Sequence, residues 1–286
     1  MRRQAVIAVG MAGLALGCAG LPHRAEAPPT PEQMAARQAT SQAAQDAFDR
    51  KDWAHAQAEL ERLVVEAPRS AEGHNRLGRV FLAQNRTTEA DSAFRDALKI
   101  DHEYVEALIG LGQSALASGR LEESLKLLDQ AIELEPPRSE AHLARGQALE
   151  LLGRPDQALA AYFRALETDT NLVSAALRIA SLQVDQGRYD QALARLDNVI
   201  EVTPEDPQAR YLRGRTHLAL KNTSQAVEDL TFASERMAQK PEVFFELALA
   251  LEASKKRTDA LKAADKATTL APNWAEAREL SAKLRR

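Results

Sequence analysis

Apolar residues recur at steps of three and four along most of this chain, which is the spacing of one buried face of a helix. One such run extends from Leu108 to Leu116, and a second extends from Leu121 to Ile132. Gly119 lies between the two runs, and a Pro-Pro turn follows the second. Because glycine caps helix ends and proline cannot continue a helix, the pattern predicts two helices joined as a hairpin, here named helix A and helix B.

The hairpin pattern recurs with a fixed period. Gly78, Gly112, Gly146 and Gly214 are separated by multiples of 34 residues, and alanine fills the other places of this register. A fixed period of this size predicts a stack in which each hairpin buries its apolar faces against its neighbours. The seven copies begin at Arg37, Ala71, Val105, Ser139, Val173, Pro207 and Pro241.

Residue size varies systematically within each copy, counted from its first residue. The eighth position is glycine or alanine, and a glycine inside a helix costs about 1 kcal/mol against alanine. We therefore expect close contact between helices A and B there. The twentieth position is small and the twenty-fourth is larger in most copies, which predicts interdigitated packing. The residues at the twenty-fourth position are Leu60, Phe94, Leu128, Tyr162, Leu196, Leu230 and Ala264.

These positions carry a resemblance to the tetratricopeptide repeat family. The Leu-Gly pairs of helix A, the small twentieth residues and Pro136 follow the family pattern, whereas Arg145 and Arg213 replace the leucine of the pair. The resemblance implies an all-α, right-handed α-solenoid of stacked helical hairpins. Seven units would occupy residues 37–274, and a polar capping helix would occupy residues 275–286.

Composition agrees with a thin stack of helices. Of the 286 residues, 45% are hydrophobic but only 5% are aromatic, which suits a core of alanine and leucine. The formal net charge of −4 disfavours nucleic acid as a partner, because binding to phosphate backbones depends on basic surfaces.

The N-terminus predicts secretion and lipidation. Arg2 and Arg3 precede an apolar stretch that is shorter than the roughly 20 residues of a membrane-spanning helix. This order of residues predicts a secretory signal over residues 1–17. The segment Leu14-Ala15-Leu16-Gly17-Cys18 resembles the lipobox of bacterial lipoproteins, which implies cleavage before Cys18 and acylation of its thiol. The alternative is that Cys18 is a small apolar residue in an ordinary signal or anchor.

The segment after Cys18 is rich in proline and predicts an extended, disordered tether over residues 18–36. In lipoproteins of the resembled type, Ala19 in place of aspartate directs the protein to the outer membrane. We therefore expect a lipid-anchored protein of the bacterial cell envelope, on the periplasmic face of the outer membrane.

Catalytic motifs are missing from the sequence. It contains no phosphate-binding glycine loop, no HExxH and no GxSxG. His74 and His142 share the fourth position of their copies, but two units separate them, which is too far for one metal ion. The sequence therefore predicts no enzyme activity, no metal site, no cofactor and no small-molecule substrate.

Basic residues follow helix A in several copies, at Arg86, Arg120, Arg154 and Arg188. Cations are favourable at the C-terminal end of a helix dipole, and this explanation also accounts for the carboxylates at helix starts. The alternative is a basic rail that meets anionic lipid headgroups or cell-wall polymer.

The candidate binding site follows from the resemblance, because helix A lines the concave surface in this family. The fifth position of helix A is apolar from the third copy onward, and the ninth position supplies hydrogen-bond donors beside it. An apolar stripe with flanking donors suits an extended peptide or a partner helix. The alternative is that the fifth position packs on the next helix A. The candidate groove residues are Arg79, Ile109, Gln113, Leu143, Gln147, Leu177, Tyr211, Arg215 and Phe245.

These features together predict a non-enzymatic, membrane-tethered scaffold that binds protein partners of an envelope complex in its groove. The chain resembles repeat-containing lipoproteins that assist pilus secretin assembly. The alternative is an accessory regulator that recruits cell-wall hydrolases or a cell-wall enzyme complex.

Overall fold

A computed structural model describes residues 30–286 of the chain. The described residues form fifteen α-helices and no strand, so the prediction of an all-α solenoid is confirmed. The helices are α1 (Pro31–Asp49), α2 (Trp53–Glu66), α3 (Ala71–Ala83), α4 (Thr87–Ile100), α5 (Val105–Ala117), α6 (Leu121–Leu134), α7 (Ser139–Leu151), α8 (Pro155–Thr168), α9 (Val173–Asp185), α10 (Tyr189–Val202), α11 (Pro207–Ala219), α12 (Thr223–Arg236), α13 (Pro241–Ala253), α14 (Arg257–Leu270) and α15 (Ala275–Arg285).

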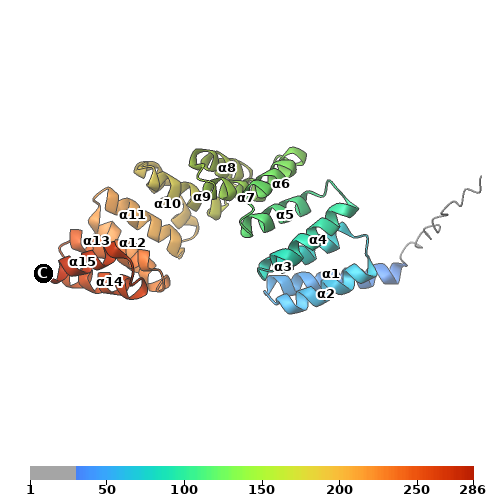
Figure 1. Cartoon of the computed structure of the whole chain (residues 1–286), viewed down its shortest axis with the longest axis horizontal. Helices are drawn as coiled ribbons and strands as arrows, with labels where there is room; N and C mark the ends of the chain where they lie inside the picture. Colours follow the sequence, from blue (N-terminus) through green and yellow to red (C-terminus); the bar gives the residue numbers. More distant parts are fainter. Residues whose placement is uncertain (1–29) are drawn as a thin grey trace, which may run out of the picture.

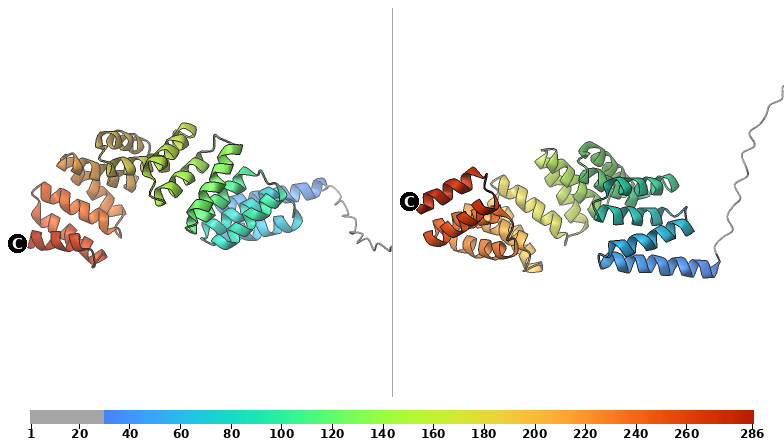
Figure 2. Two further views of the ribbon diagram at one scale, coloured as in Figure 1. Left: turned by 45° about the horizontal axis from the view of Figure 1, so that its top comes forward. Right: turned by 60° about the horizontal axis from the view of Figure 1, so that its bottom comes forward.

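The helices stack as consecutive hairpins into an arch (Figure 1). The odd-numbered helices α5, α7 and α9 lie on the inner side of the arch, and α6, α8 and α10 lie on the outer side. Figure 2 shows from two further directions that the chain runs from one end of the arch to the other, with α1 and α15 at opposite ends. No helix between residues 30 and 286 combines the length and apolar character needed to cross a bilayer.

Close contact between helix A and helix B holds each hairpin together. A Cβ atom added at Gly78 would lie 2.7 Å from the Phe94 ring, and one added at Gly112 would lie 2.8 Å from Leu128. The larger side chains at the twenty-fourth position are fully buried at these contacts. The hydroxyl of Ser124, a twentieth-position residue, donates a 2.7 Å hydrogen bond to the Gly112 carbonyl. The expectation that glycine permits a close approach of the two helices is therefore confirmed.

The turn between helices A and B has the same backbone conformation in every unit. Gly119, Gly153 and Gly187 have φ values of +73°, +70° and +73° at the fifteenth position, as expected for glycine caps. In the other four units a residue with a side chain adopts this left-handed conformation, with φ between +59° and +62°. These residues are Lys51, Asn85, Lys221 and Lys255. The stack therefore imposes the turn even where the residue does not favour it.

The first helix starts earlier than the sequence predicts. The proposed tether over residues 18–36 ends at Thr30, because α1 begins at Pro31. The Thr30 side chain accepts a hydrogen bond from the Gln33 backbone, and the Gln33 side chain accepts one from the Thr30 backbone. This capping box, with proline in the first helical turn, explains why a proline-rich segment becomes helical here. The predicted signal over residues 1–17, Cys18 and the tether up to residue 29 lie outside the described residues.

Polar contacts at repeated positions join helix B to the next helix A at three of the junctions between described units. Arg145 donates to Asp129 at 2.6 Å, and Arg213 donates to Asp197 at 2.8 Å. At the C-terminal end, Ser281 of α15 donates to Asp265 at 2.5 Å. In each pair the seventh position of one copy contacts the twenty-fifth position of the copy before it. Arg145 and Arg213 therefore replace the usual leucine because an aspartate faces them.

Asp229 is the most deeply buried charge among the described residues, with 1% of its surface exposed. Arg210 donates to its carboxylate at 2.9 Å, and Arg213 donates to it at 2.7 and 2.9 Å. The hydrogen bonds to Asp229 raise the pKa of the Arg213 guanidinium. Since Arg213 also contacts Asp197 on α10, this cluster connects α10, α11 and α12.

We predict that Lys221→Gly stabilises the protein. Glycine removes the left-handed strain of a residue with a Cβ atom, so the free energy of unfolding in urea should rise by about 1 kcal/mol. The matched control is Gly153→Ala, because an added Cβ atom there meets nothing within 4 Å. In this control the free energy of unfolding should fall by a similar amount. An unchanged or lower stability for Lys221→Gly would show that the turn is not strained.

We also predict that Asp229→Ala destabilises the stack by about 3–5 kcal/mol, because it leaves two guanidinium groups partly buried without their carboxylate. Chemical denaturation measures the loss. The control Asp197→Ala removes a half-exposed partner of the same Arg213, and it should change stability by only about 1 kcal/mol or less. Equal losses for the two variants would contradict a special role for the buried cluster.

Candidate functional site

The A helices line the inner side of the arch. Direct contacts join α3 to α5, α5 to α7, α9 to α11 and α11 to α13. Because the same positions of successive copies lie side by side, a row of residues at one position runs along the concave surface. The fifth and ninth positions of helix A form two such rows.

The row at the fifth position packs between successive A helices. Ile109 is only 6% exposed and belongs to the apolar cluster around α5 and α7, so a partner cannot reach it in this structure. Leu143 and Leu177 are half-buried against clusters that combine residues of their own hairpin with residues of adjacent units. Inter-unit packing, the alternative that the sequence left open, therefore describes most of this row.

Tyr211 and Phe245 continue the row towards the C-terminal end. Tyr211 packs against the cluster of α9 and α10 and also against that of α13 and α14. Burial raises the pKa of its phenol to about 12. The Phe245 ring lies with its centroid 4.7 Å from that of Trp274, directly before α15. Both rings are half-buried, so each has an edge on the concave surface but contributes most of its area to the core.

The row at the ninth position is more accessible and polar. Arg79 is exposed, with its guanidinium carbon 5.3 Å from the Phe48 ring. Gln113 and Gln147 are half-buried at the same position of the next two copies. Arg215 lies 5.7 Å from the Tyr211 ring. The ninth position thus carries cationic and amide side chains, and at Arg215 one of them lies beside the fifth-position Tyr211.

Ion pairs run along the C-terminal half of the concave surface, and sequence analysis missed them. Arg178 on α9 lies 3.4 Å from Glu150 on α7, and Glu150 also accepts a 2.7 Å hydrogen bond from the Tyr162 hydroxyl. Burial and this carboxylate raise the pKa of the Tyr162 phenol. Further along, Arg215 lies 3.6 Å from Asp185 and 3.4 Å from Glu246. Each pair connects neighbouring A helices, so the concave surface is charged as well as apolar.

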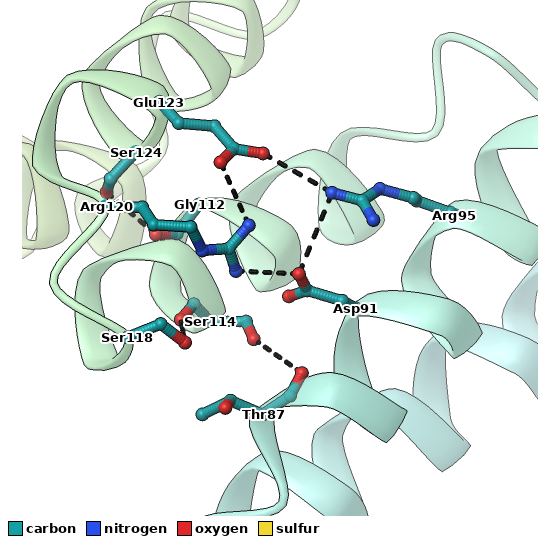
Figure 3. Close-up of polar contacts among 9 residues, drawn as sticks. All are labelled: Thr87, Asp91, Arg95, Gly112, Ser114, Ser118, Arg120, Glu123 and Ser124. Carbon is teal, nitrogen blue, oxygen red and sulfur yellow. Dashed lines mark hydrogen bonds and ion pairs between the residues drawn. The ribbon is translucent and has the colours of Figure 1, made fainter.

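A second polar cluster lies between α4 and the turn from α5 to α6 (Figure 3). Arg120 in this turn donates to Asp91 at 2.6 Å and to Glu123 at 2.9 Å. Arg95 on α4 lies 3.7 Å from Asp91 and 3.4 Å from Glu123. Two guanidinium groups and two carboxylates therefore form a ring that joins two units.

The equivalent turn arginines on either side make similar contacts. Arg86 donates to Gln57 at 2.8 Å and to Glu89 at 3.0 Å, and Arg154 donates to Glu122 at 2.9 Å. Gln57 and Glu122 belong to the preceding helix B. Because Arg86, Arg120 and Arg154 are engaged by neighbouring units, these three turn cations serve inter-unit contact and do not form an open basic rail.

Comparison of the sequence with models of known protein families agrees with the stack of helical hairpins. A sequence model of the tetratricopeptide repeat matches residues 41–104, 109–171 and 177–231, which together are more than half of the chain. The chain belongs to the tetratricopeptide repeat family. Proteins of this family are generally non-catalytic scaffolds for protein–protein interaction, and the concave surface described above is the surface formed by helix A of each tetratricopeptide unit. Curated protein sequences yield no match.

Solved structures with similar folds are also tetratricopeptide proteins. The chain matches the APC/C hetero-tetramer Cut9-Hcn1 with a TM-score of 0.68 and 15% identity, over 89% of this chain and 47% of the other. It therefore spans about half of that chain. The match to Pseudomonas aeruginosa pilF has a TM-score of 0.57 and 20% identity, over 88% and 99% of the two chains. YrrB, described as a TPR protein with an unusual peptide-binding site, matches with a TM-score of 0.52 and 22% identity, over 68% and 97%. At these identities the likeness shows the fold.

Between residues 30 and 286, no group of three or more His, Cys, Asp or Glu side chains is arranged to hold a metal ion. The predicted lipidation site, Cys18, lies outside this range and remains a prediction. The concave surface is the candidate functional site because the chain belongs to a family of protein-binding repeats.

We predict that Glu246 makes stability depend on pH. Burial raises the pKa of its carboxyl above the ordinary 4.5, although Arg215 opposes this shift. A folded state with the higher pKa binds the proton more tightly, so the contribution of Glu246 to stability falls as pH rises from 4.5 through the raised pKa. Glu246→Gln should therefore gain stability relative to the original protein over this range.

Urea denaturation at a series of pH values up to neutrality measures the difference between the two proteins. Glu242→Gln is the matched control, because it removes the same charge at an exposed position one turn earlier on α13. A difference for Glu246→Gln that does not grow with pH would contradict the role of burial.

Proposed function

We propose that this tetratricopeptide protein is a membrane-tethered adaptor that binds a peptide or helix of an envelope protein on its concave surface. The observation that carries the proposal is the row of polar ninth-position side chains along the A helices, of which Arg79 is exposed and Gln113, Gln147 and Arg215 are half-buried. Arg79, Gln113, Gln147 and Arg215 can donate hydrogen bonds, and the half-buried edges of Leu143, Leu177, Tyr211 and Phe245 lie in the adjacent row. Polar donors beside apolar edges suit a segment with alternating polar and apolar contacts.

The basic side chains of the concave surface indicate which charge a partner segment carries. Arg79 lies near the aromatic ring of Phe48 and is exposed, whereas Arg215 is shared between Asp185 and Glu246. A partner with an acidic side chain near the N-terminal half of the arch would meet Arg79 without competing with an internal carboxylate in this structure. We therefore propose that the partner segment carries acidic residues at its end nearest α3.

The membrane part of the proposal rests on the sequence. Residues 1–17 have the order of a secretory signal, and Cys18 ends a segment that resembles a lipobox. An acylated Cys18 would hold the arch on the periplasmic face of the outer membrane, with residues 19–30 between the lipid and α1. Stable anchoring takes more than one acyl chain, as lipoproteins of this type carry.

Two envelope processes fit such an adaptor. The first is assembly of a pilus or its secretin, and the alternative is recruitment of cell-wall hydrolases or another cell-wall enzyme complex. The structural likeness to Pseudomonas aeruginosa pilF reflects the fold and does not favour the first process over the second. In either process the protein acts by holding partners together, without a cofactor.

We predict that the concave surface carries partner binding, which site-specific crosslinking can test. A photo-crosslinking amino acid placed at Gln147 or at Arg79 should capture the same partner protein in intact cells. The matched control places it at Lys126 or Gln130, which are exposed on α6 on the outer side of the arch. Capture from α6 but not from the ninth-position row would contradict the proposal.

We also predict that Cys18→Ser releases the protein from membranes. The change removes the thiol that acylation needs, so the protein should move from the membrane fraction to the soluble fraction while circular dichroism remains helical. Ala19→Ser, a neighbouring change that keeps the thiol, should remain in the membrane fraction. If Cys18→Ser stays in the membrane fraction, the lipoprotein proposal is contradicted, whereas the proposal of partner binding on the concave surface is not affected.

A further inference from the structure

A pocket of about 240 Å³ opens between the end of α8 and the hairpin of α9 and α10. It lies where one tetratricopeptide unit meets the next, and helix B contributes much of its wall, so it is distinct from the rows of helix A residues on the concave surface. Arg195 of α10 is the one charged side chain that lines it. Its other lining residues are Leu166, Thr170, Asn171, Leu172, Val173, Ala176, Asn198, Val199 and Val202.

Arg195 has no carboxylate partner among residues 30–286. Its Nε atom is buried and has no hydrogen-bond partner among the described residues. Burial lowers the pKa of its guanidinium, and no nearby carboxylate opposes this shift. The Phe163 ring lies 5.2 Å from the guanidinium carbon and covers part of it. This cation–π contact compensates part of the charge, but the ring supplies no hydrogen-bond acceptor and no negative charge, and a partly buried guanidinium is favoured further by a carboxylate.

The fold does not require arginine at this place. Arg195 occupies the twenty-third position of its unit, and the corresponding residues Ala93, Ala161 and Ala263 are buried alanines. Asp229 occupies the same position one unit later and has two arginine partners of its own. Alanine would therefore fill the position in Arg195's unit as it does in three others. The unpaired cation points to a ligand that the protein does not supply.

The lining of the pocket defines the chemistry of this ligand. A single guanidinium balances one negative charge, and the planar geometry of guanidinium matches a carboxylate with two parallel hydrogen bonds. Asn198 and Thr170 place an amide and a hydroxyl in the same lining, and Leu172, Val199 and Val202 supply an apolar wall. A second negative charge would meet no second cation there.

We propose that this pocket binds a monocarboxylate joined to an apolar group about as large as one aliphatic side chain. Two sources offer this chemistry: the C-terminal residue of a polypeptide that ends in an aliphatic side chain, and a free acid such as an N-acylated amino acid. The pocket acts independently of the concave surface, so the inference goes beyond the proposed function.

Calorimetry with three probes tests the proposal and separates the sources. The probes are a short acetylated peptide that ends in leucine, the same peptide with a C-terminal amide, and N-acetylleucine. The free-acid peptide should bind at least about tenfold more tightly than its amide, as expected for loss of one charge-assisted hydrogen-bond pair. Equal affinity of N-acetylleucine would assign the site to small acids, and much weaker binding would assign it to chain termini.

Variants then connect binding to Arg195. Arg195→Ala should bind the free-acid peptide at least about tenfold more weakly than the original protein does. Its melting temperature should stay unchanged or rise, because a charge without a carboxylate partner is removed. Arg195→Gln should behave in the same way and guards against a local packing effect of alanine. The matched control Arg164→Ala removes an exposed arginine of α8 that pairs with Glu167, and it should bind normally.

Several outcomes would overturn the proposal. These are equal binding of the acid and the amide, no binding of either free acid at millimolar concentration, and normal binding by Arg195→Ala. A large fall in the melting temperature of both Arg195 variants would show that the arginine serves the fold, which would equally remove the reason for a ligand.

Discussion

The close approach of helix A to helix B is the constraint on which this molecule depends. Glycine or alanine at the eighth position lets the backbone of helix A approach a large, fully buried side chain on helix B, as at Gly78 with Phe94 and at Gly112 with Leu128. A side chain at these glycines would have to displace a buried residue of the partner helix. Because this contact recurs every 34 residues, the hairpins stack in one register, and the A helices line the inner side of the arch.

Polar contacts then adjust how neighbouring units meet. The pairs Arg145 with Asp129 and Arg213 with Asp197 connect the same two positions of successive copies. The ring of Arg120, Asp91 and Glu123 connects the turn of one unit to helix B of the unit before it (Figure 3). These contacts lie at the edges of an alanine- and leucine-rich core that is thin and continuous. The contacts between neighbouring units therefore differ along the stack mainly in their charged side chains. The buried Asp229 is the strongest example.

Sequence periodicity predicts the architecture because close packing recurs at fixed positions. The glycine caps, the contacts at the eighth position and the C-terminal helix all follow from residue type at a given place in the copy. The left-handed backbone of lysines such as Lys221 cannot be predicted from residue type, because the turn between the helices requires this conformation and lysine does not favour it. The segment 31–36 was predicted as extended from its proline content, whereas the hydrogen bonds between Thr30 and Gln33 start a helix there.

The candidate site was predicted less completely because it depends on how units are rotated against one another. The period places Ile109 and Tyr211 in one row, but only the angle between neighbouring A helices decides that Ile109 is buried and that Tyr211 keeps an exposed edge. The contact of Arg178 with Glu150 joins the sixth and twelfth positions of adjacent copies, a spacing that has meaning only once the stack is known. The same holds for Arg195, since the missing counter-charge is a property of its surroundings.

Small-angle X-ray scattering of the chain from residue 30 onward tests the central claim most directly, which is that the stacked hairpins form an open arch with an accessible inner surface. A compact chain of this length has a radius of gyration of about 18 Å. The account predicts a clearly larger radius and a distance distribution with a long tail, because the stacked hairpins form an arch (Figure 1). A radius near the compact value with a symmetric distribution would contradict it, because the hairpins would then close on one another and leave no concave surface for a partner.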